Sequence, residues 1–180
     1  MNLKKTSVKI SYLLRHNPEG LKIDKEGWVE IAPLISKLKI DIDTLNKIVS
    51  EDNKQRYSID ANKLKIRANQ GHSIDVDIKF KEQVPPTMLY HGTSPDNLDK
   101  IKKNGLCKMS RKYVHLSADK DTAIIVGKRH SKHKEPVILS IDCKKMLLDK
   151  IPFYISENKV WLVDHVDPKY ILDFERQNYE

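Results

Sequence analysis

The sequence predicts an α+β protein of two lobes, residues 1–81 and residues 88–180, joined by a linker over residues 82–87. Helical patterns precede short alternating runs in the first part, whereas strand and helix patterns are interleaved in the second. Between them lies the polar stretch KEQVPPT, whose two adjacent prolines favour an extended connection. The 180 residues, 39% of them hydrophobic, suffice for one ordinary domain or two small lobes.

The first lobe is predicted to place its helices before its sheet. Apolar residues at helical spacing predict three helices, over residues 6–17, 31–38 and 44–49. Short runs with period-two alternation predict three strands, over residues 55–59, 64–68 and 74–80. Three helices followed by a small sheet is the order of elements in a winged helix, so we expect a winged-helix-like lobe.

The second lobe is predicted to contain more strand than helix. Ser94 and Pro95 have the residue types of a helix cap and first turn, and that helix is expected to end at Gly105. Another helix is expected over residues 121–128. Strands are expected over residues 88–92, 113–116, 137–141, 153–155, 159–163 and 170–174.

Charge and composition restrict the classes of protein. The net charge is +8, and 16 basic and 12 acidic residues precede Pro86 while 17 and 13 follow it, so the excess is spread along the chain. Such a surplus suits a polyanionic partner, but it is also common in lysine-rich proteins. No apolar stretch is long enough to span a membrane, and no secretory signal is recognised. With only Cys107 and Cys143, we expect a cytoplasmic protein without a disulfide framework. No heptad pattern or strand-edge feature demands an oligomer, so we expect a monomer.

The end of the first predicted helix, LLRHNPEG, is a candidate anion site. The helical phase places Arg15 and His16 opposite the apolar face of Ile10, Leu13 and Leu14. An arginine fork and a histidine can bind phosphate oxygens, although a solvated helix face would show the same pattern. Arg56 lies at the entry to the predicted strand of residues 55–59 and is expected to be exposed, whereas Arg111 precedes the predicted strand of residues 113–116. Spacing alone does not bring the three arginines together.

The stretch LYHGTS is a second candidate. Gly92 could let a ligand approach the backbone and Thr93 could bind its oxygens, or the stretch could be an ordinary turn with a helix cap. No dinucleotide-binding or P-loop glycine motif is present. A zinc site at His130 and His133 is disfavoured by the lysines and arginine around them and by the lack of a C-x-x-C pair. Neither cysteine has a neighbouring histidine that would indicate a nucleophile.

Several motifs together resemble a known family. They occur in the order SYLLRHNPE, D-x-x-GWV, NKQRYS, IRANQGHS, PPTMLYHGTS, YVHLS, VGKRH and ENKVWLVDHV, and they extend over about residues 9–172. In this order they closely resemble the NAD-dependent RNA 2′-phosphotransferases, also called tRNA 2′-phosphotransferases. The resemblance implies a winged-helix-like RNA lobe followed by a β-rich, ADP-ribosyltransferase-like lobe that binds NAD⁺.

The resemblance also implies a reaction and the residues that perform it. An internal RNA 2′-phosphate attacks NAD⁺, nicotinamide leaves, and ADP-ribose 1″,2″-cyclic phosphate is released from 2′-OH RNA, with no metal required. The family's functional quartet corresponds here to Arg15, His16, Arg56 and Arg111. His16 either protonates the departing 2′-oxygen or orients the phosphate, and the sequence does not choose between these roles.

The positions that would bind NAD⁺ follow from the same resemblance. They are His91, Gly92, Thr93, His115, Leu116, Ser117 and, for the diphosphate, Arg129. Val160 or Trp161 stands at a third element where related transferases often have a glutamate, and Lys159 stands where a glycine is usual. Arg67, Gln70 and His72 belong to a family-like segment to which no role is assigned.

Two other functions are compatible with these residues. A transferase of the same type could attach ADP-ribose to a terminal nucleic-acid phosphate and stop after the first step. A winged-helix protein could bind nucleic acid without catalysis, in which case Arg111 and His115 would not matter for its function.

Overall fold

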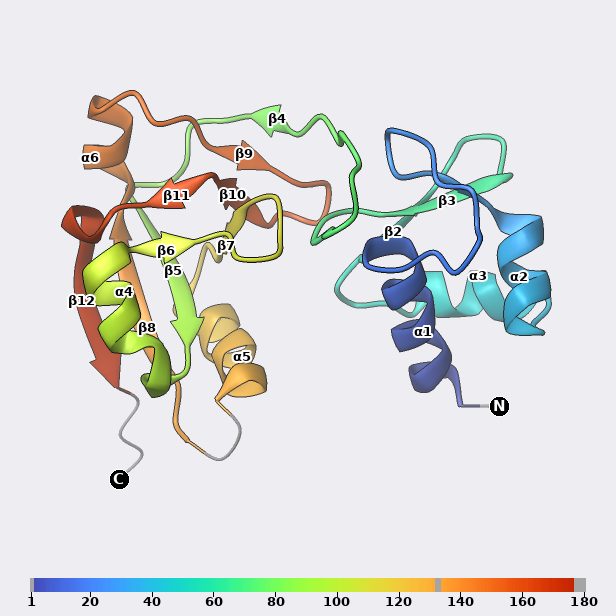
Figure 1. The fold of residues 1–180 in the computed structure, drawn as a ribbon, viewed down its shortest axis with the longest axis horizontal. Coiled ribbons are helices and arrows are strands. Elements are labelled where there is room, and N and C mark those ends of the chain that lie inside the picture. Colours follow the sequence, from blue (N-terminus) through green and yellow to red (C-terminus); the bar gives the residue numbers. More distant parts are fainter. Residues whose placement is uncertain (1, 132–133, 177–180) are drawn as a thin grey trace. The chain divides into compact units, whose positions relative to one another are not determined.

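The computed structural model describes residues 2–131 and 134–176, with the side chain of Arg176 excepted. The chain divides into two compact units, Met1–Lys79 and Phe80–Glu180, which are described separately (Figure 1). Helices and small antiparallel sheets occur in both units, so the predicted α+β class is confirmed. Among the described residues, no helix is both long and apolar enough to cross a membrane.

The first unit consists of three helices and a three-stranded sheet. The helices are α1 (Leu3–Arg15), α2 (Ile31–Leu38) and α3 (Ile42–Ser50). The strands β1 (Val29–Glu30), β2 (Tyr57–Ile59) and β3 (Lys65–Ala68) form an antiparallel sheet in the order β1-β3-β2. The chain therefore passes through a helix, a short strand, two helices and two strands.

Local chemistry explains why these helices begin where they do. The Asn2 side chain accepts a hydrogen bond from the Lys5 backbone at 3.1 Å and caps α1, and Asp41 caps α3 by accepting from Thr44 at 2.7 Å. The apolar stripe of α1 packs inward with residues of both other helices and the sheet. Its fully buried members are Ile10, Leu13 and Leu14, as the helical phase predicted.

The predicted strand over residues 74–80 is wrong, because no strand is formed there. The alternation of burial is nevertheless present, since Val76 is buried while Asp75 and Asp77 are exposed. The backbone hydrogen bonds go to loops and a helix end instead of a sheet: Asp77 N donates to the Lys25 carbonyl at 2.6 Å. The third strand of the sheet is β1. It has only two residues, which are too few for an alternating pattern to be recognised in the sequence.

Several boundaries in the first unit also differ from the prediction by one to three residues. Helix α1 runs from Leu3 to Arg15, so His16 is its C-cap and lies outside the helical turn. Strand β2 begins at Tyr57 because Gln55 has a positive φ of 45°, which is incompatible with an extended strand.

The described residues of the second unit form three small sheets and three α-helices. The sheet orders are β12-β8-β5, β4-β9-β10-β7 and β11-β6. The strands are β4 (Lys81–Glu82), β5 (Met88–Thr93), β6 (Leu106–Cys107), β7 (Val114–Leu116), β8 (Val137–Asp142), β9 (Tyr154–Ile155), β10 (Trp161–Val163), β11 (His165–Val166) and β12 (Ile171–Arg176). The helices are α4 (Leu98–Asn104), α5 (Lys120–His130) and α6 (Cys143–Leu148).

Most elements expected in the second unit are present. Ser94 caps a 3-10 turn over Pro95–Asn97, which leads into α4, and Gly105 ends that helix at a φ of 72°. The strands β5, β7, β8 and β12 lie where period and composition placed them, whereas β9 and β10 are shorter than expected. Lys159 has a φ of 62°, so it adopts the left-handed conformation for which a glycine is usual.

Gly92 on β5 shows how closely α5 packs on this sheet (Figure 1). A Cβ added at Gly92 would lie 1.8 Å from the Ala123 carbonyl oxygen and 2.9 Å from the Gly127 backbone nitrogen. Both of those atoms are in α5, so Gly92 is required by the contact between strand and helix. A contact between a ligand and the Gly92 backbone stays a prediction.

Replacing Gly92 by alanine is expected to lower the free energy of unfolding by about 2 kcal/mol or more, because helix backbone must move to admit the methyl group. Urea denaturation of the full chain measures this change. Ile125→Ala is the matched control, since Ile125 is on the same helix but 55% exposed, and should cost about 0.5 kcal/mol or less. Equal stability of the two variants would contradict the close packing.

Candidate functional site

The end of α1 is fixed by a later segment of the chain. The backbone nitrogens of Ser73 and Ile74 donate to the Arg15 carbonyl oxygen, at 2.9 and 3.3 Å. The Ser73 hydroxyl lies 2.9 Å from His16 Nδ1. The last turn of a helix leaves carbonyls without helical partners, and here one of them is satisfied by this segment. Residues 73 and 74 therefore hold the backbone at Arg15 and the ring of His16 together.

His16 and Arg15 differ in exposure. His16 is exposed, as the helical phase predicted, and its ring centroid is 6.1 Å from that of Tyr12. Arg15 is only half-exposed, and its Nε and Nη2 atoms are buried. Arg15 is thus less exposed than the helical phase predicted, because two nitrogens of its guanidinium are covered.

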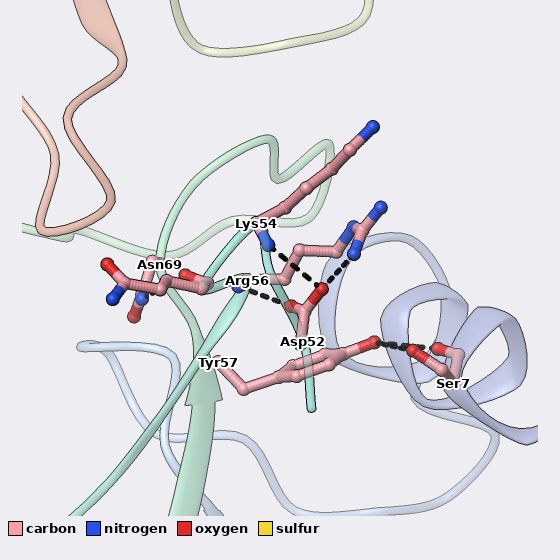
Figure 2. Close-up of polar contacts among 7 residues, drawn as sticks. Ser7, Asp52, Lys54, Arg56, Tyr57 and Asn69 are labelled. Carbon is pink, nitrogen blue, oxygen red and sulfur yellow. Dashed lines mark hydrogen bonds and ion pairs between the residues drawn. The ribbon is translucent and has the colours of Figure 1, made fainter. Parts of the chain in front are cut away.

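Arg56 is held by a carboxylate that sequence reasoning missed. Asp52 forms an ion pair with Arg56 Nη1, and its second oxygen accepts from the Arg56 backbone nitrogen at 2.6 Å (Figure 2). The Asp52 side chain is 5% exposed and that of Arg56 is 30% exposed. Arg56 is thus half-buried, and the expectation of an exposed surface arginine is corrected. The pairing fixes the guanidinium while leaving part of it accessible.

Asn69 secures the same turn from the other side. Its backbone nitrogen donates to the Arg56 carbonyl at 2.8 Å, and its side-chain nitrogen donates to the Gln55 carbonyl at 2.7 Å. The Ser58 hydroxyl donates to the Asn69 side-chain oxygen at 2.6 Å. Asn69 is 5% exposed, so these bonds are shielded from water. The family-like segment that contains Asn69 and Ser73 therefore supports both Arg56 and the end of α1.

Other members of that segment have packing roles. Arg67 stacks over the Trp28 ring, with its guanidinium carbon 4.5 Å from the ring centroid. His72 is 4% exposed, and its Nε2 would lie 3.5 Å from a Cβ added at Gly27. Of the three positions that sequence reasoning left unassigned, Arg67 and His72 thus pack within this unit, and Gln70 stays without a role.

His16 and Arg56 line one pocket of about 610 Å³. Its walls come from α1, from the end of α3 and from the turn before β2. Tyr57 also lines it, and its hydroxyl donates to the Ser7 carbonyl at 2.7 Å (Figure 2). Burial raises the pKa of the Tyr57 phenol, so that hydroxyl keeps its proton. The fold therefore brings together two of the three basic residues expected in this unit.

In the second unit, the motifs around His91 and His115 lie side by side. Tyr90 and Ser117 exchange backbone hydrogen bonds of 2.9 and 2.8 Å, which joins the middle of β5 to the end of β7. His91 Nδ1 is 2.9 Å from the His115 carbonyl oxygen. The sequence elements predicted to contribute to one site are thus neighbours within this unit.

The hydrogen bond of His91 defines its protonation. A carbonyl oxygen only accepts, so the proton is on Nδ1. Burial lowers the pKa of His91, because desolvation disfavours the charged ring, and the bond to His115 offsets this only partly. His91 is therefore neutral near pH 7, with Nε2 as a hydrogen-bond acceptor, which suits a hydroxyl donor such as a ribose.

Arg111 is hydrogen-bonded to the ring of His115. Arg111 Nη1 donates to His115 Nδ1 at 2.7 Å. Since a guanidinium has no acceptor, His115 must present an unprotonated Nδ1, and the proton of its neutral ring is on Nε2. His115 therefore links two predicted residues: its carbonyl binds His91 and its ring binds Arg111.

The remaining predicted positions have different surroundings. Thr93 is 5% exposed and its hydroxyl accepts from the Asn97 side chain at 3.2 Å, while Leu116 is buried in the core. Strand β10 pairs with β7, with Leu162 opposite His115 and Trp161 opposite Leu116, so the predicted third element borders the second. Arg129 lies exposed in the last turn of α5.

The candidate metal ligands and the two cysteines have the following surroundings in the described part of the chain. No group of three or more His, Cys, Asp or Glu side chains there could hold a metal ion. The considered histidine pair includes His133, which lies outside the described residues. Both cysteines are free, Cys107 exposed and Cys143 buried. Burial raises the pKa of the Cys143 thiol to about 12, so it is not a thiolate nucleophile near neutral pH.

These features define a two-unit α+β protein with a basic pocket in one unit and paired histidines in the other. A family model described as RNA 2′-phosphotransferase, Tpt1/KptA family, matches residues 2–165, and the chain belongs to this family. It is 52% identical over 169 residues to a probable RNA 2′-phosphotransferase of Fusobacterium nucleatum, covering 90% of this chain and 93% of that protein.

Other relatives have the same description. The probable RNA 2′-phosphotransferase of Flavobacterium johnsoniae is 45% identical over 175 residues, covering 93% of this chain and 94% of that protein. That of Trichormus variabilis is 47% identical over 174 residues, with the same two coverages. The similarity therefore includes both units.

The Asp52–Arg56 pair yields a stability prediction. Asp52→Ala should lower the free energy of unfolding by about 1–3 kcal/mol, because it leaves a half-buried guanidinium and the Arg56 N–H without their acceptor. Glu51→Ala is the control in urea denaturation. The Glu51 side chain is 60% exposed and its Oε1 is 3.9 Å from Lys47 Nζ, so its removal should lower the free energy of unfolding by about 0.5 kcal/mol or less. An Asp52→Ala variant as stable as Glu51→Ala would refute the anchoring role.

Proposed function

We propose that the protein removes an internal 2′-phosphate from RNA by transferring it to NAD⁺. Membership of the RNA 2′-phosphotransferase family and the names of the relatives support the activity. The observation that carries the proposal is the pocket in which exposed His16 and carboxylate-anchored Arg56 occur together. A basic pair held on a rigid backbone is suited to a phosphate dianion.

In the proposed reaction, the RNA 2′-phosphate attacks C1″ of NAD⁺ and nicotinamide leaves with the bonding electrons. The product is an RNA 2′-phospho-ADP-ribose. Its ribose 2″-hydroxyl then attacks the phosphorus, which breaks the bond to the RNA 2′-oxygen and forms ADP-ribose 1″,2″-cyclic phosphate. A proton delivered to the departing oxygen restores the RNA 2′-hydroxyl.

The first unit would bind and aim the phosphate. The phosphate is already nucleophilic, so no carboxylate base is needed to activate it, and the residues have to hold it and stabilise charge. Arg56 supplies a bidentate fork, Arg15 a second cation, and His16 either the proton for the departing oxygen or an orienting hydrogen bond. The order of elements in this unit, a helix, a strand, two helices and two strands, supports the winged-helix comparison.

The second unit would bind NAD⁺, and its donor set fits a dinucleotide. Neutral His91 offers an acceptor for a ribose hydroxyl, Ser117 a hydroxyl, and exposed Arg129 a cation for the diphosphate. Arg111, held at 2.7 Å by His115, would stabilise phosphate charge in the second step. We propose that the protein acts in this way as a cytoplasmic monomer on tRNA-like RNA.

The test is to incubate the full chain with an RNA carrying one internal 2′-phosphate, with and without NAD⁺. With NAD⁺ we expect 2′-OH RNA, nicotinamide and ADP-ribose 1″,2″-cyclic phosphate in equal amounts, measured by mass spectrometry and chromatography. Removal of the phosphate without NAD⁺, or its retention with NAD⁺, would refute the proposal.

An RNA that bears only a terminal phosphate serves as the control for the alternative activity. The proposed function predicts no stable ADP-ribose adduct on this RNA. Accumulation of an RNA–ADP-ribose product in place of the cyclic phosphate would instead indicate a transferase that stops after the first step.

A further inference from the structure

The pocket that contains His16 and Arg56 is larger than a phosphate needs. Its volume of about 610 Å³ lies in the range of sites that hold a small organic ligand. The two basic residues occupy only part of its lining. Leu3, Val8 and Ile48 contribute apolar side chains from α1 and α3. A phosphate bound by His16 and Arg56 would therefore have an apolar cavity beside it.

Two side chains of α1 in this pocket present apolar surface that the core does not use. Tyr12 is 43% exposed and Val8 is 65% exposed, although both line the pocket. The Tyr12 ring has Lys9 Nζ at 5.3 Å from its centroid, and the His16 ring centroid at 6.1 Å with an angle of 48° between the planes. An exposed ring flanked by a cation and an imidazole is typical of surfaces that stack on nucleobases.

The charges of the pocket favour a nucleic acid as its occupant. Lys4 and Arg56 line it with His16, and the chain has a net charge of +8. The acidic side chains in the lining are already engaged, since Asp52 pairs with Arg56 and Glu51 lies 3.9 Å from Lys47. Cations beside an accessible aromatic ring match the combination of backbone phosphates and bases in single-stranded RNA.

We propose that this pocket binds the base of the nucleotide that carries the 2′-phosphate, with Tyr12 as its stacking surface. This inference rests on the proposed function, because His16 and Arg56 must hold the 2′-phosphate. In a nucleotide, the 2′-oxygen and the base are attached to adjacent carbons of the ribose. A phosphate fixed by His16 and Arg56 consequently keeps its own base within reach of the cavity wall. The base needs no sequence-specific contact, since every base has a face that can stack.

The experiment uses short RNAs with one internal 2′-phosphate and either all bases present, an abasic phosphorylated nucleotide, or an abasic 3′ neighbour. In the parent protein, removing the base of the phosphorylated nucleotide should lower kcat/KM about five-fold or more, as loss of a stacked base does. Tyr12→Ala should show the same loss with intact RNA and no further loss with the abasic RNA. Tyr12→Phe, which keeps the ring, should behave like the parent.

Leu64→Ala is the matched control, because Leu64 is an exposed apolar residue of the same unit that does not line the pocket, with 66% exposure. In the Leu64→Ala variant, removal of the base should lower kcat/KM as much as it does in the parent. The inference is overturned if base removal has no effect on the parent, if only the abasic 3′ neighbour matters, or if Tyr12→Ala remains as sensitive to base removal as the parent.

Binding of the same RNAs without NAD⁺, followed by fluorescence anisotropy, separates this inference from the proposed function. If the parent binds the abasic RNA more weakly than the intact RNA, and Tyr12→Ala binds the two RNAs equally, the base pocket is supported even if no phosphate is transferred. Transfer of the phosphate with equal affinity and equal kcat/KM for intact and abasic RNA would leave the proposed function standing and refute the base pocket.

Discussion

The first unit depends on the segment of residues 69–74 that follows its sheet. Asn69 fixes the backbone carbonyls of Gln55 and Arg56, while the N–H groups of Ser73 and Ile74 cap the Arg15 carbonyl. Arg15 and Arg56 are 41 positions apart in the chain, and this one segment is hydrogen-bonded to the backbone of both. The polar side chains of the pocket therefore start from fixed positions, which lowers the entropy cost of binding a phosphate.

In the second unit, His115 connects several of the predicted site residues. Its carbonyl accepts from His91, its ring accepts from Arg111, and its strand pairs with β10 opposite Leu162. The tautomers of the two histidines follow from these bonds and need no separate assumption. A change at His115 would thus alter the position of Arg111 and the acceptor offered by His91 together.

Sequence patterns predicted many of the regular parts of the fold, and family-like motifs supplied the candidate site residues. The buried face of α1 and the cap at Ser94 follow from local rules that need no tertiary information. Asp52 could not be found in this way, because its role depends on a turn that returns its carboxylate to Arg56. The alternation over residues 74–80 predicted the buried side chains correctly but could not reveal that the backbone pairs with loops. The packing role of Gly92 was hidden for the same reason, since the backbone it contacts belongs to a helix 31 or more positions later.

The most direct test of this account is a crystal structure of the full chain with a 2′-phosphorylated RNA in the absence of NAD⁺. The account predicts that oxygens of the 2′-phosphate lie within hydrogen-bond distance of the Arg56 guanidinium and the His16 ring, with Arg56 still paired to Asp52. An ordered RNA whose 2′-phosphate contacts neither His16 nor Arg56 would contradict it.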